Sequence, residues 1–260
     1  MSKTKSFITR KAAVMVVGGA IAATVLLAGP GLRGTPVAQA QEMSQEEFET
    51  RVRDYLMAHP EVILEAVQGL QARQEQDAAQ AAQAAIGDRA DDLLHDPDSP
   101  VAGNPDGDVT LVEFFDYNCP YCRQVAPVMA EAMAADPELR VVYKEFPILG
   151  EGSDFAARAA LAADRQGRYL AFHEAMMAHQ GTVDRNVTLV LAEDVGLDLE
   201  RLEADMADPA IRAAINRTYE LAGALQINGT PGFVVGDTII PGAVDLATLQ
   251  AAIGQAREAQ

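Results

Sequence analysis

The sequence predicts a mixed α/β domain with an all-helical insertion, preceded by an N-terminal helical extension. Three observations lead to this fold class. An apolar, β-prone run at residues 109–115 passes directly into a segment with helical spacing. Residues 154–225 are rich in alanine and have a helical pattern throughout. A hairpin signal and a last helical pattern then close the chain.

The first forty residues have the three parts of a cleavable export signal. Basic residues precede an apolar run from Ala12 to Gly29, and Ala38-Gln39-Ala40 supplies a small-x-small cleavage site. We therefore predict a signal peptide over residues 1–40 and a periplasmic mature protein that begins at Gln41. The alternative is a permanent membrane anchor, although glycines interrupt the run and its length is near the lower limit for a span.

The composition is strongly acidic, with a formal net charge of −18. A surface of this charge repels phosphate backbones, so nucleic acid is excluded as a partner. After residue 40, no run is apolar over a length that would cross a membrane.

Residues 41–94 form the predicted helical extension. Ser44 and Glu47 have the spacing of a capping box, and His59-Pro60 interrupts the helical pattern. Apolar residues on both sides of this break form a stripe, which must pack either on the main domain or on another chain. We favour the second alternative and expect a homo-oligomer through residues 44–94.

The main domain is predicted to span residues 95–260. Its first part, up to residue 108, is rich in proline, glycine and aspartate and is predicted to be a loop or linker. The patterns then predict strands at 109–115, 140–146, 232–235 and 238–240, and helices at 119–135, 154–225 and 245–255. Gly236-Asp237 fits a tight hairpin turn between the last two strands.

The chain has two cysteines, Cys119 and Cys122, in a C-x-x-C arrangement. Structural disulfides of secreted domains usually come in several pairs, so a single close pair indicates reactive thiols. Cys119 follows a strand at the start of a helix, where free amide groups and the helix dipole stabilise a thiolate. We expect Cys119 to be the exposed, attacking sulfur and Cys122 to be the buried sulfur that resolves the mixed disulfide. Tyr121 lies between them and would tune their redox poise.

Half of a zinc site and two buried structural thiols are the alternatives for this pair. A zinc site needs two further ligands, but the sequence has four histidines without H-x-x-x-H spacing and no second cysteine pair. We therefore expect neither a metal nor a cofactor.

Two segments carry a family resemblance. Residues 114–122, Phe-Phe-Asp-Tyr-Asn-Cys-Pro-Tyr-Cys, resemble the active-site segment of the DsbA-like thioredoxin superfamily. Residues 229–236, Gly-Thr-Pro-Gly-Phe-Val-Val-Gly, resemble its second signature, the loop with a cis-proline. The resemblance covers about residues 95–260. It implies a thioredoxin fold with a helical domain inserted between its two halves, at about 154–225, and protein thiol–disulfide oxidoreductase activity.

The resemblance also implies roles for individual residues. Cys119 matches the family's nucleophile and Cys122 its resolving thiol. Pro231 matches the cis-proline, and Thr230 matches the residue whose backbone pairs with an extended substrate peptide. Glu113 matches a buried acid that accepts the Cys122 proton, with a pKa raised by burial. The alternatives are an edge position for Glu113, with its carboxylate in water, and an ordinary turn at Thr230-Pro231.

Residues 55–63, Tyr-Leu-Met-Ala-His-Pro-Glu-Val-Ile, resemble the N-terminal segment of ScsC-like proteins. In some of those proteins the segment makes the protein oligomeric and supports disulfide isomerisation. The first hypothesis is therefore an enzyme that exchanges disulfides with unfolded or misfolded exported proteins. A membrane redox partner would recycle its cysteine pair. Isomerisation is slightly favoured over oxidation.

The second hypothesis is a soft-metal (copper) binding protein or a holdase that uses the same thiols as ligands. Substitution of Cys119 by alanine distinguishes the two hypotheses. It abolishes disulfide exchange by a redox enzyme, whereas a holdase keeps its activity.

Overall fold

The computed structural model describes residues 43–259, so the predicted signal peptide lies outside the described residues. The chain divides into two units, one that ends at His59 and one that begins at Pro60. Across the part of the chain that the structure describes, no helix has the length and apolar character needed to span a membrane.

The first unit contains the helix α1 (Gln45–Ala58). The Ser44 side chain accepts a hydrogen bond from the backbone N–H of Glu47 at 3.2 Å, so the predicted cap is present. None of the residues of α1 is buried. The exposed fractions of Phe48, Val52 and Tyr55 are 58%, 41% and 56%. The helix therefore has no apolar core of its own.

The second unit begins with a long helix, α2 (Glu61–Asp88), after the predicted break at Pro60. Its C-terminal end is fixed, because Ile86 is buried and the Gln83 side chain donates to the Asp237 carboxylate at 2.9 Å. The short helix α3 (Ala90–Leu94) follows and buries Leu93 completely. The end of the helical extension is therefore part of the core of the second unit.

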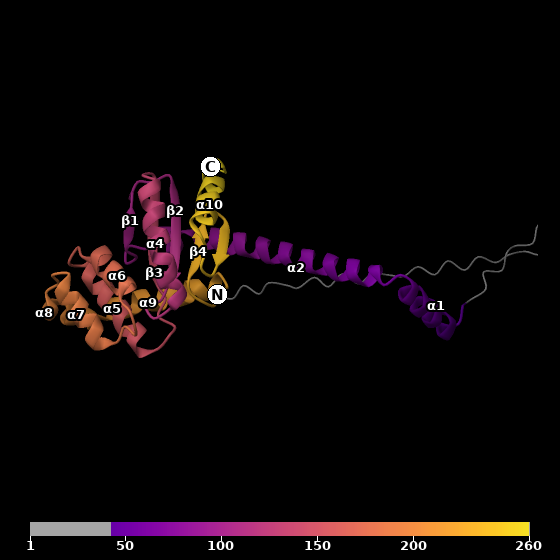
Figure 1. Ribbon diagram of the computed structural model, residues 1–260, viewed down its shortest axis with the longest axis horizontal. Helices are drawn as coiled ribbons and strands as arrows, with labels where there is room; N and C mark the ends of the chain where they lie inside the picture. Colours follow the sequence, from indigo (N-terminus) through magenta and orange to yellow (C-terminus); the bar gives the residue numbers. More distant parts are fainter. Residues whose placement is uncertain (1–42, 260) are drawn as a thin grey trace, which may run out of the picture. The chain divides into compact units, whose positions relative to one another are not determined.

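A five-stranded mixed sheet lies at the centre of the second unit (Figure 1). In spatial order its strands are β1 (Val101–Gly103), β3 (Leu139–Glu145), β2 (Val109–Phe115), β4 (Gly232–Val235) and β5 (Thr238–Pro241). β2 and β3 are parallel and are connected through α4 (Pro120–Ala135), whereas the other neighbouring pairs are antiparallel. The predicted thioredoxin fold is confirmed.

β1 lies in the segment that the sequence predicts as a linker, and that prediction is wrong for Val101–Gly103. These residues pair with the outer side of β3. Three residues are too few to show the alternation that identifies a strand from sequence. The strand is recognisable only through its pairing partner.

The two faces of the sheet are covered by different helices. Leu111 and Phe115 point into the larger core, which includes α4 and the last helix, α10 (Leu246–Glu258). Val112 and Phe114 point into the smaller core, with α3 and α9 (Pro209–Ala224). Because successive side chains of a strand point to opposite faces, β2 is apolar along almost its whole length.

The helical insertion consists of α5 (Glu151–Asp164), α6 (Tyr169–Ala178), α7 (Arg185–Asp194), α8 (Leu199–Met206) and α9. It agrees with the predicted helical block at about 154–225. α5 is the central helix of the group, with contacts to the other four. Nine of its residues are buried, and most of these are alanines, which allow close packing of the neighbouring helices.

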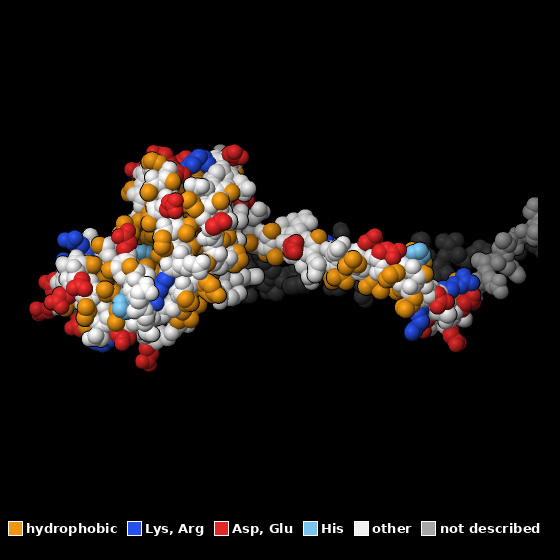
Figure 2. Space-filling model, in the orientation of Figure 1, with side chains coloured by type: hydrophobic (Ala, Val, Ile, Leu, Met, Phe, Trp, Pro, Cys, Tyr) orange, Lys and Arg blue, Asp and Glu red, His pale blue; other side chains and the backbone are white. Residues whose placement is uncertain are grey.

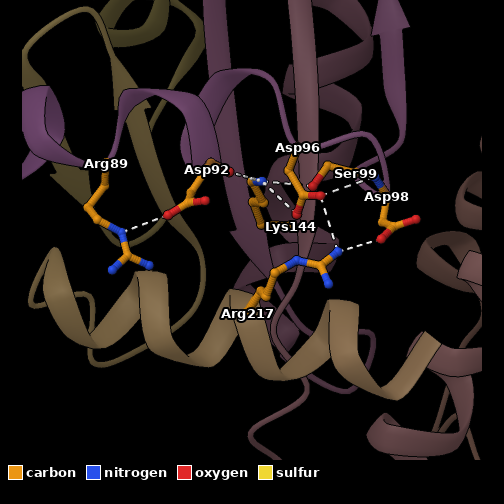
Figure 3. Close-up of polar contacts among 7 residues, drawn as sticks. All are labelled: Arg89, Asp92, Asp96, Asp98, Ser99, Lys144 and Arg217. Carbon is orange, nitrogen blue, oxygen red and sulfur yellow. Dashed lines mark hydrogen bonds and ion pairs between the residues drawn. The ribbon is translucent and has the colours of Figure 1, made fainter. Parts of the chain in front are cut away.

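A buried lysine fastens α3 and the loop after it to the sheet (Figure 3). Lys144 on β3 is 1% exposed, and its Nζ donates to the carbonyl oxygen of Asp92 at 2.6 Å and to Ser99 Oγ at 2.7 Å. The carboxylate of Asp96 lies 3.8 Å away and also binds Arg217 of α9. Burial lowers the pKa of Lys144 to about 8, although the charge of Asp96 opposes this shift.

Candidate active site

The cysteine pair lies at the N-terminal end of α4, directly after β2. Cys119 is the N-cap residue and has an extended backbone, with φ −77° and ψ 117°. Pro120 occupies the first helical position, where its missing N–H removes no helical hydrogen bond. The Cys119 amide donates to the carbonyl oxygen of Asp116 at 3.0 Å. The cysteines thus occupy the strand-to-helix position that the sequence predicts.

Both cysteines are buried, so the expectation of an exposed Cys119 is wrong. Cys119 is 4% exposed and Cys122 is 0% exposed. Cys119 is covered because its Sγ lies 3.3 Å from the carbonyl oxygen of Thr230, which accepts a hydrogen bond from the thiol. Burial is the main cause that raises the pKa of Cys122, and the nearby Cys119 and Glu113 raise it further.

The loop before β4 supplies the second side of the site. The Thr230–Pro231 peptide bond is cis, as the resemblance implies. The carbonyl oxygen of Pro231 accepts a hydrogen bond from the amide of Gly242 at 2.8 Å, which ties the loop to the end of β5. The Thr230 carbonyl oxygen, directly before Pro231, therefore meets Cys119 Sγ across 111 residues of sequence. Tyr121 is 60% exposed and lies on the first turn of α4.

Glu113 lies in the middle of β2 and is 2% exposed. It stands opposite Tyr143 of β3 and Phe233 of β4. It is therefore in the interior of the sheet and not at an edge. Burial raises the pKa of Glu113 to about 8. A carboxyl group with this pKa can both hold and release a proton near neutral pH.

Sequence patterns did not reveal the polar residues that join the active-site segment to the helical insertion. The Asn118 side chain accepts from the amide of Val183 at 2.8 Å and donates to its carbonyl oxygen at 3.0 Å. Ser153 accepts from Asn118 at 3.1 Å and donates to the Asp116 carboxylate at 2.7 Å. The approach requires Gly152, because a Cβ there would lie 2.8 Å from the Val183 oxygen.

A second buried network joins the same segment to β3 and α6. The hydroxyls of Tyr117 and Tyr169 donate to Glu145 Oε1 at 3.0 and 2.9 Å. The Tyr117 hydroxyl also lies 3.2 Å from Nδ1 of His173. Burial lowers the pKa of His173 to about 3, so the ring is neutral at physiological pH. His173 is thus a core histidine. The only sequence signal for these networks is the polar run Asp-Tyr-Asn directly before the cysteine pair.

Comparison with known families agrees with this geometry. Residues 110–254 match the DSBA-like thioredoxin domain. The chain belongs to the DSBA-like thioredoxin family. Residues 45–77 match the N-terminal domain of the copper resistance protein ScsC, so the ScsC-like resemblance of the N-terminal region is also confirmed.

Two solved structures and one curated relative illustrate the similarity of this DSBA-like protein. A thioredoxin-like oxidoreductase from Silicibacter pomeroyi is 54% identical, with 65% of this chain and 98% of that chain covered and a TM-score of 0.64. ScsC of Proteus mirabilis in a transitional conformation is 30% identical, with 83% of this chain and 97% of that chain covered and a TM-score of 0.64. A sodium/proton antiporter of Salinispora arenicola is 33% identical over 62% of this chain. The chain spans only about a quarter (25%) of that antiporter's length.

Proposed function

We propose that this DSBA-like protein exchanges disulfides with unfolded or misfolded exported proteins in the periplasm, and that isomerisation is favoured over net oxidation. One observation carries the proposal: Cys119 Sγ lies at the start of α4 and 3.3 Å from the carbonyl oxygen of Thr230, beside Pro231. The oxidoreductase family and the predicted signal peptide support it. The ScsC-like N-terminal region favours the isomerase.

The chemistry follows from the positions of the two thiols. The Cys119 thiolate attacks a client disulfide, forms a mixed disulfide and releases one client thiolate. In isomerisation, a client thiolate then attacks the mixed disulfide and frees Cys119. In oxidation, a client thiolate attacks Cys119 of the oxidised pair and Cys122 leaves as a thiolate. A second client thiolate then displaces Cys119. Net turnover needs a redox partner, which we place in the membrane.

Neighbouring groups would assist these steps. Glu113, buried behind the pair, accepts the proton of Cys122 when that sulfur attacks the mixed disulfide. The backbone of Thr230 pairs with an extended client segment, beside Pro231. Tyr121 is available for contact with the client because 60% of its surface is exposed.

A client with scrambled disulfides tests the proposal. The mature protein, supplied with a thiol reductant, is expected to restore the native disulfides. Cys119→Ala is expected to abolish this activity, and Cys122→Ala is expected to accumulate a mixed disulfide that a non-reducing gel detects after alkylation. Full activity of Cys119→Ala would refute the assigned chemistry.

We also propose that the protein forms a homo-oligomer through residues 44–94. In the first half of α2, side chains of Ile63, Leu64, Val67 and Leu70 are about half exposed, at 51%, 58%, 46% and 53%. Figure 2 shows apolar side chains gathered on the surface of this helix. A row of this size is unusual on a free helix, because apolar surface in contact with water is unfavourable.

Light scattering tests the oligomer. The mature chain is expected to have the mass of an oligomer, and Val67→Asp is expected to shift it towards monomer. Gln68→Asp, which introduces the same charge at the next residue, should have no effect. A truncated form should begin near Ala79 so that it retains Ile86 and Leu93, which the core of the second unit needs. A monomeric mature chain would overturn this assignment and favour a monomeric oxidase.

Copper binding is the second candidate, because the matched N-terminal family is that of a copper resistance protein. Two thiolates are suitable ligands for Cu(I). Within residues 43–259, no group of three His, Cys, Asp or Glu side chains is placed to hold a metal ion. A Cu(I) titration of the reduced protein tests this candidate, with the Cys119→Ala variant as the control.

A further inference from the structure

A cavity of about 350 Å³ lies between α4 and α6 and is lined by neither cysteine, nor by Glu113, Thr230 or Pro231. One of its lining residues is Arg123, which directly follows Cys122 in the sequence. Its walls are apolar and come from both helices: Ala126, Pro127, Ala130, Met133, Leu170 and Met177. A cavity of this volume with mostly apolar walls is within the range of small-molecule sites.

Two buried polar side chains also line this cavity, Tyr143 and His173. They are 2% and 4% exposed, and their ring centroids lie 4.5 Å apart. Among residues 43–259, the Tyr143 hydroxyl has no hydrogen-bond partner, and His173 has one, at Nδ1. Neither the Tyr143 hydroxyl nor His173 Nε2 is among the fully buried atoms without a partner, so both are open to hydrogen bonding by a group that enters the cavity.

The hydrogen bonds of Tyr117 determine what His173 offers. The Tyr117 hydroxyl has a single proton, which it donates to Glu145. With the Tyr117 proton on the bond to Glu145, we assign Nδ1 of His173 as the donor to Tyr117. A neutral imidazole carries only one N–H, so Nε2 of His173 is an acceptor. The buried part of the cavity lining therefore offers one acceptor, His173 Nε2, and one hydroxyl, Tyr143. Besides Arg123, the other polar lining residues are Glu174 and Gln180, which are exposed.

The other lining groups favour an aromatic ligand. Met133 and Met177 contribute one thioether from each helix, and thioethers make favourable contacts with aromatic rings. Arg123 at the rim donates to the neutral oxygens of Tyr117, Gly181 and Asn118, and has no carboxylate partner among the described residues. A guanidinium group in this state can also stack on a ring.

We propose that this cavity binds a phenolic ring, which lies between Met133 and Met177, donates its O–H to Nε2 of His173 and accepts from the hydroxyl of Tyr143. A phenol supplies one donor and one acceptor on a flat apolar body. Indole supplies only a donor, and toluene supplies neither. The ring could belong to a tyrosine side chain or to a free small phenol.

NMR spectroscopy of the mature protein with labelled methionine methyl groups tests the site. Titration with p-cresol is expected to shift the signals of Met133 and Met177 in a saturable manner. 4-Methylanisole has no O–H to donate and is expected to bind about tenfold more weakly than p-cresol. Equal affinity for the two compounds, or unchanged methionine signals with p-cresol, would overturn the proposal.

Matched variants separate the cavity from general effects. Ala130→Phe places a ring in the cavity and is expected to abolish p-cresol binding. Ala134→Phe, on the same helix outside the cavity, should leave binding unchanged. Tyr143→Phe removes only the hydroxyl. It is expected to weaken the binding of p-cresol about five- to tenfold and to change the binding of 4-methylanisole little. Binding that survives Ala130→Phe would show that the ligand binds elsewhere.

A last comparison distinguishes the two sources of the ring. A peptide with one cysteine and one tyrosine is attached to Cys119 in the Cys122→Ser variant, beside a matched peptide with phenylalanine. Shifts of Met133 and Met177 that require the tyrosine assign the site to polypeptide clients. Shifts with p-cresol alone assign it to a free phenol. The p-cresol titration needs no disulfide exchange, so its outcome does not depend on the proposed function.

Discussion

The side-chain amide of Asn118 makes two hydrogen bonds to the backbone of Val183, one as acceptor at 2.8 Å and one as donor at 3.0 Å. Asn118 directly precedes Cys119, whereas Val183 lies in the loop before α7 and is 0% exposed. One side chain therefore satisfies both backbone groups of a buried residue in the helical insertion. These bonds fix the active-site segment to the insertion.

Asn118→Ala is expected to lower the free energy of unfolding by about 1–3 kcal/mol, because it leaves the buried N–H and C=O of Val183 without partners. Urea denaturation of the reduced protein measures the loss. Asn228→Ala is the control, since Asn228 is exposed and donates only to the nearby Gln226. Equal effects of the two substitutions would contradict the role given to Asn118.

Glu113→Gln is expected to change how stability depends on pH. The pKa of Glu113 is raised from 4.5 to about 8 by burial, so the folded protein holds this proton after the unfolded chain has lost it. The wild type therefore loses free energy of unfolding, relative to the variant, as the pH rises from 4.5 to about 8. The loss is on the order of 4 kcal/mol over that interval.

Urea denaturation at several pH values measures this difference between wild type and Glu113→Gln. Glu131→Gln, at an exposed position on α4, is the control and should show no such trend. A difference between wild type and Glu113→Gln that stays constant between pH 4.5 and 8 would exclude a raised pKa for Glu113.

Lys144→Met is expected to lower the free energy of unfolding by about 2–4 kcal/mol at neutral pH, because Asp92, Ser99 and Asp96 lose a buried donor. The pKa of Lys144 is lowered from 10.5 to about 8, so the folded protein releases this proton before the unfolded chain does. The wild type should therefore gain stability relative to the variant as the pH rises from 8 to 10.5.

Thermal or urea unfolding across that pH range measures both effects of Lys144→Met. Arg217→Met is the comparison, because Arg217 binds the same Asp96 but its side chain is 39% exposed. Its loss should be smaller, at about 1 kcal/mol or less. If the arginine variant is the less stable of the two, the buried lysine is not the main anchor of α3.

The features that sequence predicts well are those set by short, repeated patterns. The strand predicted at 109–115 agrees with β2, and the predicted helix at 119–135 agrees with α4 apart from its cap. Both depend on local periodicity and on the chemistry of helix starts. The meeting of Cys119 with Thr230 needed the family resemblance, because no local pattern brings the two residues together.

The features that sequence does not predict depend on partners far away in the chain. Asn118 and Val183 are separated by 65 residues, and Tyr117 and His173 by 56. From the sequence alone, each of these residues can equally be interpreted as an ordinary loop or core residue. The wrong prediction of an exposed Cys119 has the same cause. A helix start predicts an accessible sulfur, but the loop that covers this sulfur comes from the other half of the fold.

The burial of the two thiols predicts a strong order of reaction with iodoacetamide in the reduced protein. The thiolate is the reactive form, and the raised pKa of Cys122 keeps that sulfur protonated at pH 8 and below. Cys119 is the more accessible of the two, although it is only 4% exposed. Cys119 is therefore expected to react at least about tenfold faster, as mass spectrometry of the digested protein measures. In urea the two rates should converge, because unfolding removes the burial. Similar rates in the folded protein would mean that Cys122 is not protected, and its assignment as the resolving thiol would lose its physical basis.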